Sequence, residues 1–250
     1  MARPEGTGFA LATCATLTAY NNLFGLHRWH RRWYVPINAC AAGAALSAAA
    51  ASGLSAADLG LGRGAWRPGR LAVGLAAATC SGWLLSAVVP AAHPVLADKR
   101  VTSLDGRAAA YGAVVRIPVG TVLWEEIAFR GVLHAALRRV MPERAAIVAS
   151  AAVFGLWHIR PTAEALRANG LTRGRGLAVA NVTAGCAATA AGGLVLSWLR
   201  ARSGSLAAPM LVHLATNSGG QVAAWAVAGR ARRAPRLGIS ALMGPASAAG

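Results

Sequence analysis

Two adjacent glutamates interrupt an apolar run in the stretch Thr121-Val122-Leu123-Trp124-Glu125-Glu126-Ile127-Ala128-Phe129-Arg130. The chain of 250 residues has only eight acidic residues, and the other six lie in or next to polar, arginine-bearing stretches. A charged side chain at hydrocarbon depth costs roughly 2.5 to 3.5 kcal/mol on insertion scales unless something compensates for it. The adjacent glutamates therefore predict a functional site in this segment.

The composition of the chain is typical of a polytopic membrane protein. Apolar residues make up 56% of the sequence and charged residues 13%, whereas a soluble domain has about 25% charged residues. The apolar residues form blocks that short arginine clusters separate, and the loops are too short for a soluble domain. We therefore expect residues 1–250 to form one integral-membrane domain. Abundant Ala, Gly and Arg with a single lysine favour a bacterial protein of the cytoplasmic membrane.

The net charge of +17 raises the question of nucleic-acid binding. The basic residues do not gather in one patch or tail, however, but punctuate the apolar blocks. This distribution is expected of loops that meet anionic lipid headgroups. We therefore expect the lipid bilayer to be the partner of these charges, and we expect no binding of nucleic acid.

Apolar blocks of about 20 residues are long enough to cross a bilayer. Such blocks run approximately over 8–26, 35–57, 71–92, 108–137, 144–160, 177–199 and 205–229. The fourth block is too long for one simple span, and it contains Arg116, Pro118 and the glutamate pair, so we expect a break or kink there. The sequence predicts an all-α transmembrane bundle of seven helices, or eight if that block is divided, around an intramembrane polar cavity.

Arg130 gives one of the two glutamates a local partner. It lies four residues after Glu126, one helical turn on, so the two side chains can form a structural ion pair along one helix face. Glu125 then has no local partner, which makes it the better candidate for chemistry. We accordingly expect Glu126 to point away from the site, toward Arg130.

Two other segments carry strong polar groups inside apolar blocks. His158 ends the segment Val153-Phe154-Gly155-Leu156-Trp157-His158. His213 and Asn217 are four residues apart, so they share one helix face. Hydrogen bonds between packed helices explain each of these segments when it is taken alone. Together they place a carboxylate pair, a histidine and a histidine–asparagine face on three different spans.

This set of groups suits the hydrolysis of a peptide bond by an activated water. A carboxylate can act as a general base toward water, and a neighbouring histidine can share or orient that water. A second histidine and an amide can donate hydrogen bonds to the developing oxyanion. Alternatively, Glu125, His158 and His213 match the ligand set of a hydrolytic zinc site with water in the open position. A divalent metal such as zinc therefore stays open as a cofactor.

The order of these motifs resembles that of a known family. The pattern, on separate spans, is Glu125-Glu126-x-x-x-Arg130, then Phe154-x-x-x-His158, then His213-x-x-x-Asn217. It is similar to the CPBP family, the CAAX-protease and bacteriocin-processing (Abi) intramembrane proteases, over a core of about residues 108–229. The resemblance implies an α-helical bundle, typically of eight helices, that cleaves a peptide or small membrane-protein substrate. It also implies that Glu125 and His158 activate water while His213 and Asn217 bind the oxyanion, with metal dependence left open.

Two other functions fit buried carboxylates and histidines. A proton-coupled transporter could use these groups as a relay, and a membrane immunity or binding module could keep the scaffold without turnover. A transporter more often shows an internal repeat, and we find none in this sequence. An inactive relative would have lost one of the four polar positions, and all are present. The intramembrane endopeptidase is therefore the favoured prediction.

Overall fold

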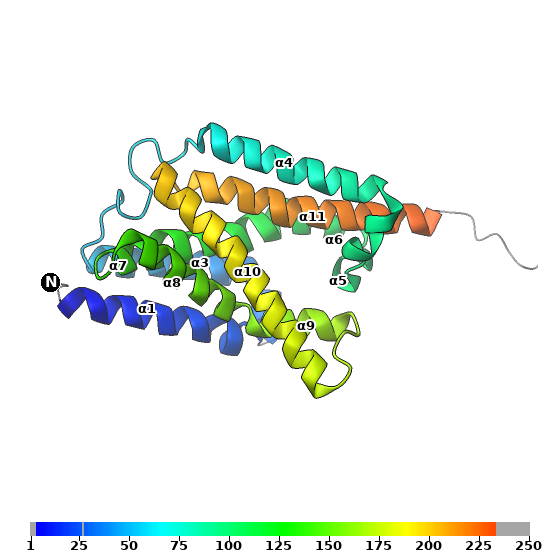
Figure 1. Ribbon diagram of the computed structural model, residues 1–250, viewed down its shortest axis with the longest axis horizontal. Coiled ribbons are helices and arrows are strands. Elements are labelled where there is room, and N and C mark those ends of the chain that lie inside the picture. Colours follow the sequence, from blue (N-terminus) through cyan, green and yellow to red (C-terminus); the bar gives the residue numbers. More distant parts are fainter. Residues whose placement is uncertain (1–3, 27, 234–250) are drawn as a thin grey trace, which may run out of the picture.

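The computed structural model describes residues 4–26 and 28–233, and this part of the chain is helical without any strand (Figure 1). Short 3-10 helices and two π-helical segments carry the label η. The first half consists of α1 (Pro4–Leu23), η1 (Phe24–Leu26), α2 (Arg28–Arg32), α3 (Tyr34–Ala51), α4 (Gly69–Val88), η2 (Pro90–Leu96) and α5 (Lys99–Thr102). The second half consists of α6 (Gly106–Tyr111), η3 (Gly112–Leu123), η4 (Glu126–Leu133), α7 (His134–Arg138), α8 (Glu143–Trp157), α9 (Ile159–Ala168), α10 (Arg175–Ser203) and α11 (Ala207–Arg233).

The helices follow the apolar blocks of the sequence. Three of them, α3, α4 and α10, are long and apolar enough to cross a membrane by length and composition, which supports an integral membrane protein. The block predicted at 35–57 is helical only as far as Ala51, and its last residues belong to the loop before α4. The long helix α11 carries the polar residues His213, Asn217 and Gln221, which lowers its hydropathy relative to those three.

The long helices surround the segment that carries the glutamates. In Figure 1, α4 and α11 lie side by side, while α1 and α8 lie on another side of the molecule and α10 crosses the bundle obliquely. η3 packs against α3 and α11, and η4 packs against α1, α3, α8, α10 and α11. The glutamates therefore lie at the centre of the bundle, within reach of side chains from several helices.

A break or a kink was predicted within block 108–137. The central segment is helical without interruption from Gly106 to Arg138, so a break is wrong. The wide i→i+5 winding of a π-helix takes the place of the break in η3 and η4, with Trp124 and Glu125 between them. Short π-helical turns are rare and frequently lie at functional sites. Pro118 lies inside η3. Because proline has no N–H it often ends a helix, but here the helix continues with a wider winding.

Side chains from other helices complete the backbone hydrogen bonding of η3. In an i→i+5 pattern the carbonyl of Ala113 would accept from residue 118, which is a proline and has no N–H. The hydroxyl of Ser218, in α11, donates to that carbonyl at 2.8 Å. Similarly, the amide of Asn38, in α3, donates to the carbonyl of Gly120 at 2.7 Å. Both neighbours of η3 thus supply donors to a helix with irregular winding.

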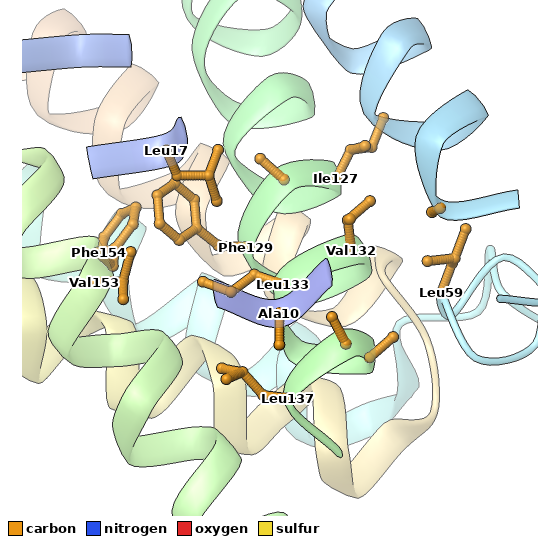
Figure 2. Close-up of a cluster of buried hydrophobic side chains, with 14 of the residues drawn as sticks. Ala10, Leu17, Leu59, Ile127, Phe129, Val132, Leu133, Leu137, Val153 and Phe154 are labelled. Atoms are coloured by element: carbon orange, nitrogen blue, oxygen red, sulfur yellow. The ribbon is translucent and has the colours of Figure 1, made fainter. Parts of the chain in front are cut away.

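The hydrophobic core forms around η4 and α7. Every residue from Trp124 to Leu137 is buried, and the side chains of Phe129 and Leu133 are 0% exposed. Figure 2 shows these two residues packed among Leu17 of α1 and Phe154 of α8. A helix that is buried on all sides needs apolar residues all round. Each polar side chain in this segment therefore requires a partner from a neighbouring element.

The loop between α3 and α4 is fastened to the corner between α10 and α11. Gly60 has a φ of +73°, and a Cβ at this position would come within 2.5 Å of Nε of Arg200. Only glycine combines this conformation with such a close approach. The guanidinium of Arg200 donates to the carbonyl of Asp58 at 2.7 Å, and the N–H of Leu206 donates to the carbonyl of Gly60 at 3.1 Å. Arg200 therefore holds this loop against the base of the bundle.

We predict that Ser218→Ala lowers thermal stability, because it leaves the Ala113 carbonyl without its donor at a cost of about 1 to 3 kcal/mol. In a Pro118→Ala background residue 118 gains an N–H, so the same change should cost less. Thermal unfolding of the four proteins of this double-mutant cycle, purified in detergent, measures the difference. Equal losses in the two backgrounds would contradict the link between Pro118 and Ser218.

Candidate active site

The glutamates lie at the junction of the two π-helical segments. Glu125 precedes η4 and is 5% exposed, and Glu126 begins η4 and is 0% exposed. His213 and Asn217 lie one turn apart on α11, and His213 is also buried. His158 directly follows the last residue of α8 and is half-buried. The predicted site residues thus come from the central segment and from the two helices that flank it.

One carboxylate oxygen of Glu126 has two partners, the guanidinium of Arg130 and the imidazole of His213. Nη1 of Arg130 donates to Oε1 of Glu126 at 3.0 Å, and Nδ1 of His213 lies 2.7 Å from the same oxygen. Glu126 therefore does not face Arg130 alone, and the expectation that it points away from the site is wrong. The physical reason is that α11 packs against η4, which brings His213 to the carboxylate. A nitrogen this close to a carboxylate oxygen carries the hydrogen, so Nε2 is the free nitrogen of a neutral His213.

Glu125 contacts the other side of the same imidazole. Its Oε2 lies 3.8 Å from Nε2 of His213, and its Oε1 accepts a hydrogen bond from Nε1 of Trp157 at 3.3 Å. Nδ2 of Asn217 lies 3.1 Å from Nε2 of His213, and an amide nitrogen can only donate to it. The imidazole of His213 therefore links both glutamates and the asparagine.

The charges of this cluster nearly cancel. With both carboxylates ionised and Arg130 charged, the formal charge of Glu125, Glu126, Arg130 and His213 is −1 for a neutral imidazole and zero for an imidazolium. A net charge in a buried site is costly. One added proton would bring the formal charge of these four residues to zero.

His158 lies beside this cluster without a direct bond to it. Its Nδ1 is 2.7 Å from the carbonyl of Phe154, and the two rings are 4.6 Å apart. Within the described ranges, no hydrogen bond or ion pair joins His158 to Glu125. The Phe154 ring also contacts the ring of His213 at 6.3 Å and the guanidinium of Arg130 at 4.2 Å. Phe154 is thus the common neighbour of His158 and the buried cluster.

Trp157 and its supports on α1 and α3 were not identified from the sequence. Trp157 donates to Glu125, and the ring of Tyr20 stacks on its indole at 5.6 Å with an interplanar angle of 2°. The hydroxyl of Tyr20 donates to Asn38 at 2.8 Å, and Asn38 in turn donates to Gly120 of η3. Polar side chains isolated in the first two apolar blocks are the signal that could have pointed to Tyr20 and Asn38, because such groups need partners in a bundle.

The end of α8 is held in place by two asparagines of α1. Nδ2 of Asn21 donates to the carbonyl of Trp157 at 3.2 Å, and Nδ2 of Asn22 donates to the carbonyl of Leu156 at 2.8 Å. The last carbonyls of a helix have no partner within the helix, so these amides complete the end of α8. They fix the position from which Trp157 and His158 project.

The side chains do not form the zinc site that was left open from the sequence. Among the described residues, no group of three or more His, Cys, Asp or Glu side chains is arranged to hold a metal ion. Nδ1 of His213 is bonded to Glu126 and Nδ1 of His158 faces the Phe154 carbonyl. In the part of the chain that the structure describes, Glu125, His158 and His213 are not arranged as three ligands of one ion.

A cavity of about 350 Å³ reaches the cluster at Asn217. Its walls come from α4, η2, α5, η3 and α11, and they include Trp83, Leu96, Ile117 and Gln221. These walls are mostly apolar, with polar groups on α11 next to Asn217. The cavity therefore offers space beside the cluster for a chain of mixed polarity.

A comparison with known protein families gives a match to the family described as Rce1-like, type II CAAX prenyl endopeptidase, over residues 107–219. No curated protein and no solved structure matches the chain. The matched segment runs from α6 to the middle of α11, and it contains Glu125, Glu126, Arg130, His158, His213 and Asn217. The match over this segment supports the CAAX-protease (CPBP) family that the order of the motifs indicated.

Proposed function

We propose that this protein is an intramembrane endopeptidase that hydrolyses a peptide bond with a water activated by Glu125. The Rce1-like family is a protease family. The observation that carries the proposal is the approach of Glu125 and His213, from separate helices, to 3.8 Å in the buried interior. Packing accounts for Glu126, which has Arg130 and His213 as partners. Glu125 is a second buried carboxylate beside that pair, and its burial destabilises the fold. A catalytic role explains why it is there.

The spacing of Glu125 and His213 suits a shared water. Because Oε2 of Glu125 and Nε2 of His213 are 3.8 Å apart, one water oxygen can lie about 3 Å from both. Glu125 takes a proton from this water as the oxygen attacks the carbonyl carbon of the substrate. The formal charge of the four-residue cluster then changes from −1 to zero. The proton passes to the leaving amine as the carbon–nitrogen bond breaks, which restores the cluster.

Asn217 is the residue that we assign to the developing oxyanion. One of its amide hydrogens points to Nε2 of His213, at an N–N distance of 3.1 Å, and the second can donate to the substrate oxygen. His213, held by Glu126 and Asn217, orients both the water and this amide. The hydrogen-bond pattern therefore favours a positioning role for His213 in place of the oxyanion contact that the family resemblance implies, because its one N–H already donates to Glu126.

His158 is assigned to the same water as Glu125, as the order of the motifs implies. Its Nδ1 donates to the Phe154 carbonyl, at 2.7 Å, which fixes the ring and leaves Nε2 as an acceptor. We propose that a peptide or the tail of a small membrane protein reaches the site through the cavity beside Asn217. We also propose that the chain is a multi-pass protein of the bacterial cytoplasmic membrane.

We predict that Glu125→Gln abolishes proteolysis while the protein still inserts and folds, because the amide has the same shape but cannot accept a proton from water. One readout is cleavage of a fluorogenic prenylated CAAX peptide by the purified protein in lipid vesicles. The other is a comparison of peptide termini in membrane proteomes of cells that carry the wild type or the variant. Retention of more than about a tenth of the activity would remove Glu125 from the role of general base. Absence of any Glu125-dependent cleavage in both readouts would contradict the proposed function.

We predict that Trp157→Phe lowers the turnover number about tenfold or more, because it removes the hydrogen bond to Glu125 and keeps an aromatic ring against Tyr20. Trp124→Phe is the matched control. Trp124 is also a buried tryptophan, but its Nε1 has no hydrogen-bond partner within the part of the chain that the structure describes. Steady-state cleavage of the CAAX peptide compares the two variants. Equal losses in both would show that ring size, rather than the bond to Glu125, matters.

We predict that Arg130→Ala lowers the folded yield and the thermal stability, because it strands a fully buried carboxylate at a cost of roughly 3 to 5 kcal/mol. Adding Glu126→Gln removes that stranded charge, so the double variant should fold better than the single one. Size-exclusion profiles and thermal unfolding in detergent measure both effects. A single variant with wild-type yield and stability would show that the Glu126–Arg130 pair does not hold the site together.

A further inference from the structure

An apolar groove lies between α1 and the end of α8. These two helices pack against each other in the bundle (Figure 1). The volume of the groove is about 760 Å³, and it lies apart from the buried cluster. The small residues Cys14, Ala15 and Ala19 form its floor on α1, between Leu11 at one end and Asn22 at the other. The lining residues Leu11, Cys14, Thr18 and Asn22 recur along α1 at a spacing of three to four residues, so the lining lies on one helix face. The opposite wall consists of residues from α8 and from the first turn of α9.

The length of the groove matches one leaflet of a bilayer. From Leu11 to Asn22 the chain advances eleven residues, or about 16 Å at 1.5 Å per residue. The hydrocarbon core of a bilayer is about 30 Å thick, so the chains of one leaflet fill about 15 Å of it. A partner helix that spans the membrane would need a contact surface about twice as long. A single acyl chain is therefore the occupant that fits this length.

The residues around the end of the groove near Asn22 are of the kinds that membrane proteins place at the lipid headgroups. The α2 segment follows closely after α1, and the indoles of Trp29 and Trp33 are 51% and 54% exposed there. Arg31 of α2 pairs with Glu164 of α9 at 2.8 Å, which places α2 beside the α9 helix. Exposed tryptophans and arginines are enriched where a membrane protein meets the headgroups. One leaflet's acyl chains start from this level.

Arg160 provides a cation at this end of the groove. It lines the groove on the first turn of α9, and Oδ1 of Asn22 accepts a hydrogen bond from its backbone N–H at 2.9 Å. Its side chain is exposed, and no ion pair within the described ranges involves it. A guanidinium can bind a phosphate with two parallel hydrogen bonds. The groove thus combines an apolar trough with a cation at its polar end.

We infer that this groove is a binding site for one anionic phospholipid, with an acyl chain in the trough and the phosphate group on Arg160. A zwitterionic lipid can fill the trough equally well, but its headgroup carries no net charge to complement the arginines of α2 and α9. The site lies against the last turn of α8, through Val153 and Leu156. The inference does not depend on the proposed proteolysis, because lipid binding is measured without a substrate.

Native mass spectrometry of the protein tests whether the charge of Arg160 contributes to lipid binding. The purified protein is exposed to an equimolar mixture of phosphatidylglycerol and phosphatidylcholine with the same acyl chains. We expect one phosphatidylglycerol to be retained preferentially, and Arg160→Gln to weaken this retention about tenfold. Arg167→Gln, which removes an exposed arginine from the same helix outside the groove, should leave retention unchanged. Equal retention of the two lipids by the wild type, or equal effects of the two substitutions, would overturn the inference.

A second pair of variants tests the trough. Ala19→Phe fills the floor of the groove, and the control Ala77→Phe places the same ring on an exposed alanine of α4, which does not border it. Both positions are exposed, so both proteins should keep the wild-type size-exclusion profile. We expect only Ala19→Phe to abolish the retained lipid. Unchanged retention in Ala19→Phe would overturn the inference. So would a wild-type dimer that Ala19→Phe dissociates, because a second copy of the chain would then occupy the groove.

Discussion

The burial of two adjacent carboxylates is the constraint on which the arrangement of the bundle depends. They lie in a helix whose residues from Trp124 to Leu137 are all buried, so water on the outside of the protein cannot compensate for their charge. The compensating groups therefore have to come from within the segment and from neighbouring helices. Arg130 supplies one charge along the same helix, and α11 and α8 supply an imidazole and an indole. The packing of these helices around η4 is thus also the assembly of the site.

The contacts along one helix could be predicted from the sequence, and the contacts between helices could not. The four-residue spacing of Glu126 and Arg130 defines their pairing, because residues one turn apart are neighbours on any helix. The order of the motifs similarly indicated the family. The bond from His213 to Glu126 depends on how α11 is rotated about its axis, and nothing in the spacing of His213 and Asn217 specifies that rotation. The same reason explains why Trp157 was missed.

The winding of the central segment shows a second limit. A proline, an arginine and two glutamates in one long apolar block predicted a break or a kink in the helix. The chain instead keeps its helix and widens it, because donors on α3 and α11 complete the backbone of η3. These donors, Asn38 and Ser218, are far from Pro118 in the sequence. Only the folded structure shows that they compensate for it.

The contacts of Tyr20 and Asn38 also show which part of the chain acts as a unit. Both residues precede the segment that matches the family, yet they support Trp157 and the wide helix that precedes Glu125. The recognisable portion of the sequence is therefore smaller than the cooperative portion of the structure. A chimera that exchanged only the recognisable portion between two relatives would inherit catalytic side chains on foreign supports. A functional chimera of two relatives with this fold therefore has to include α1 and α3 from the same parent as the matched segment.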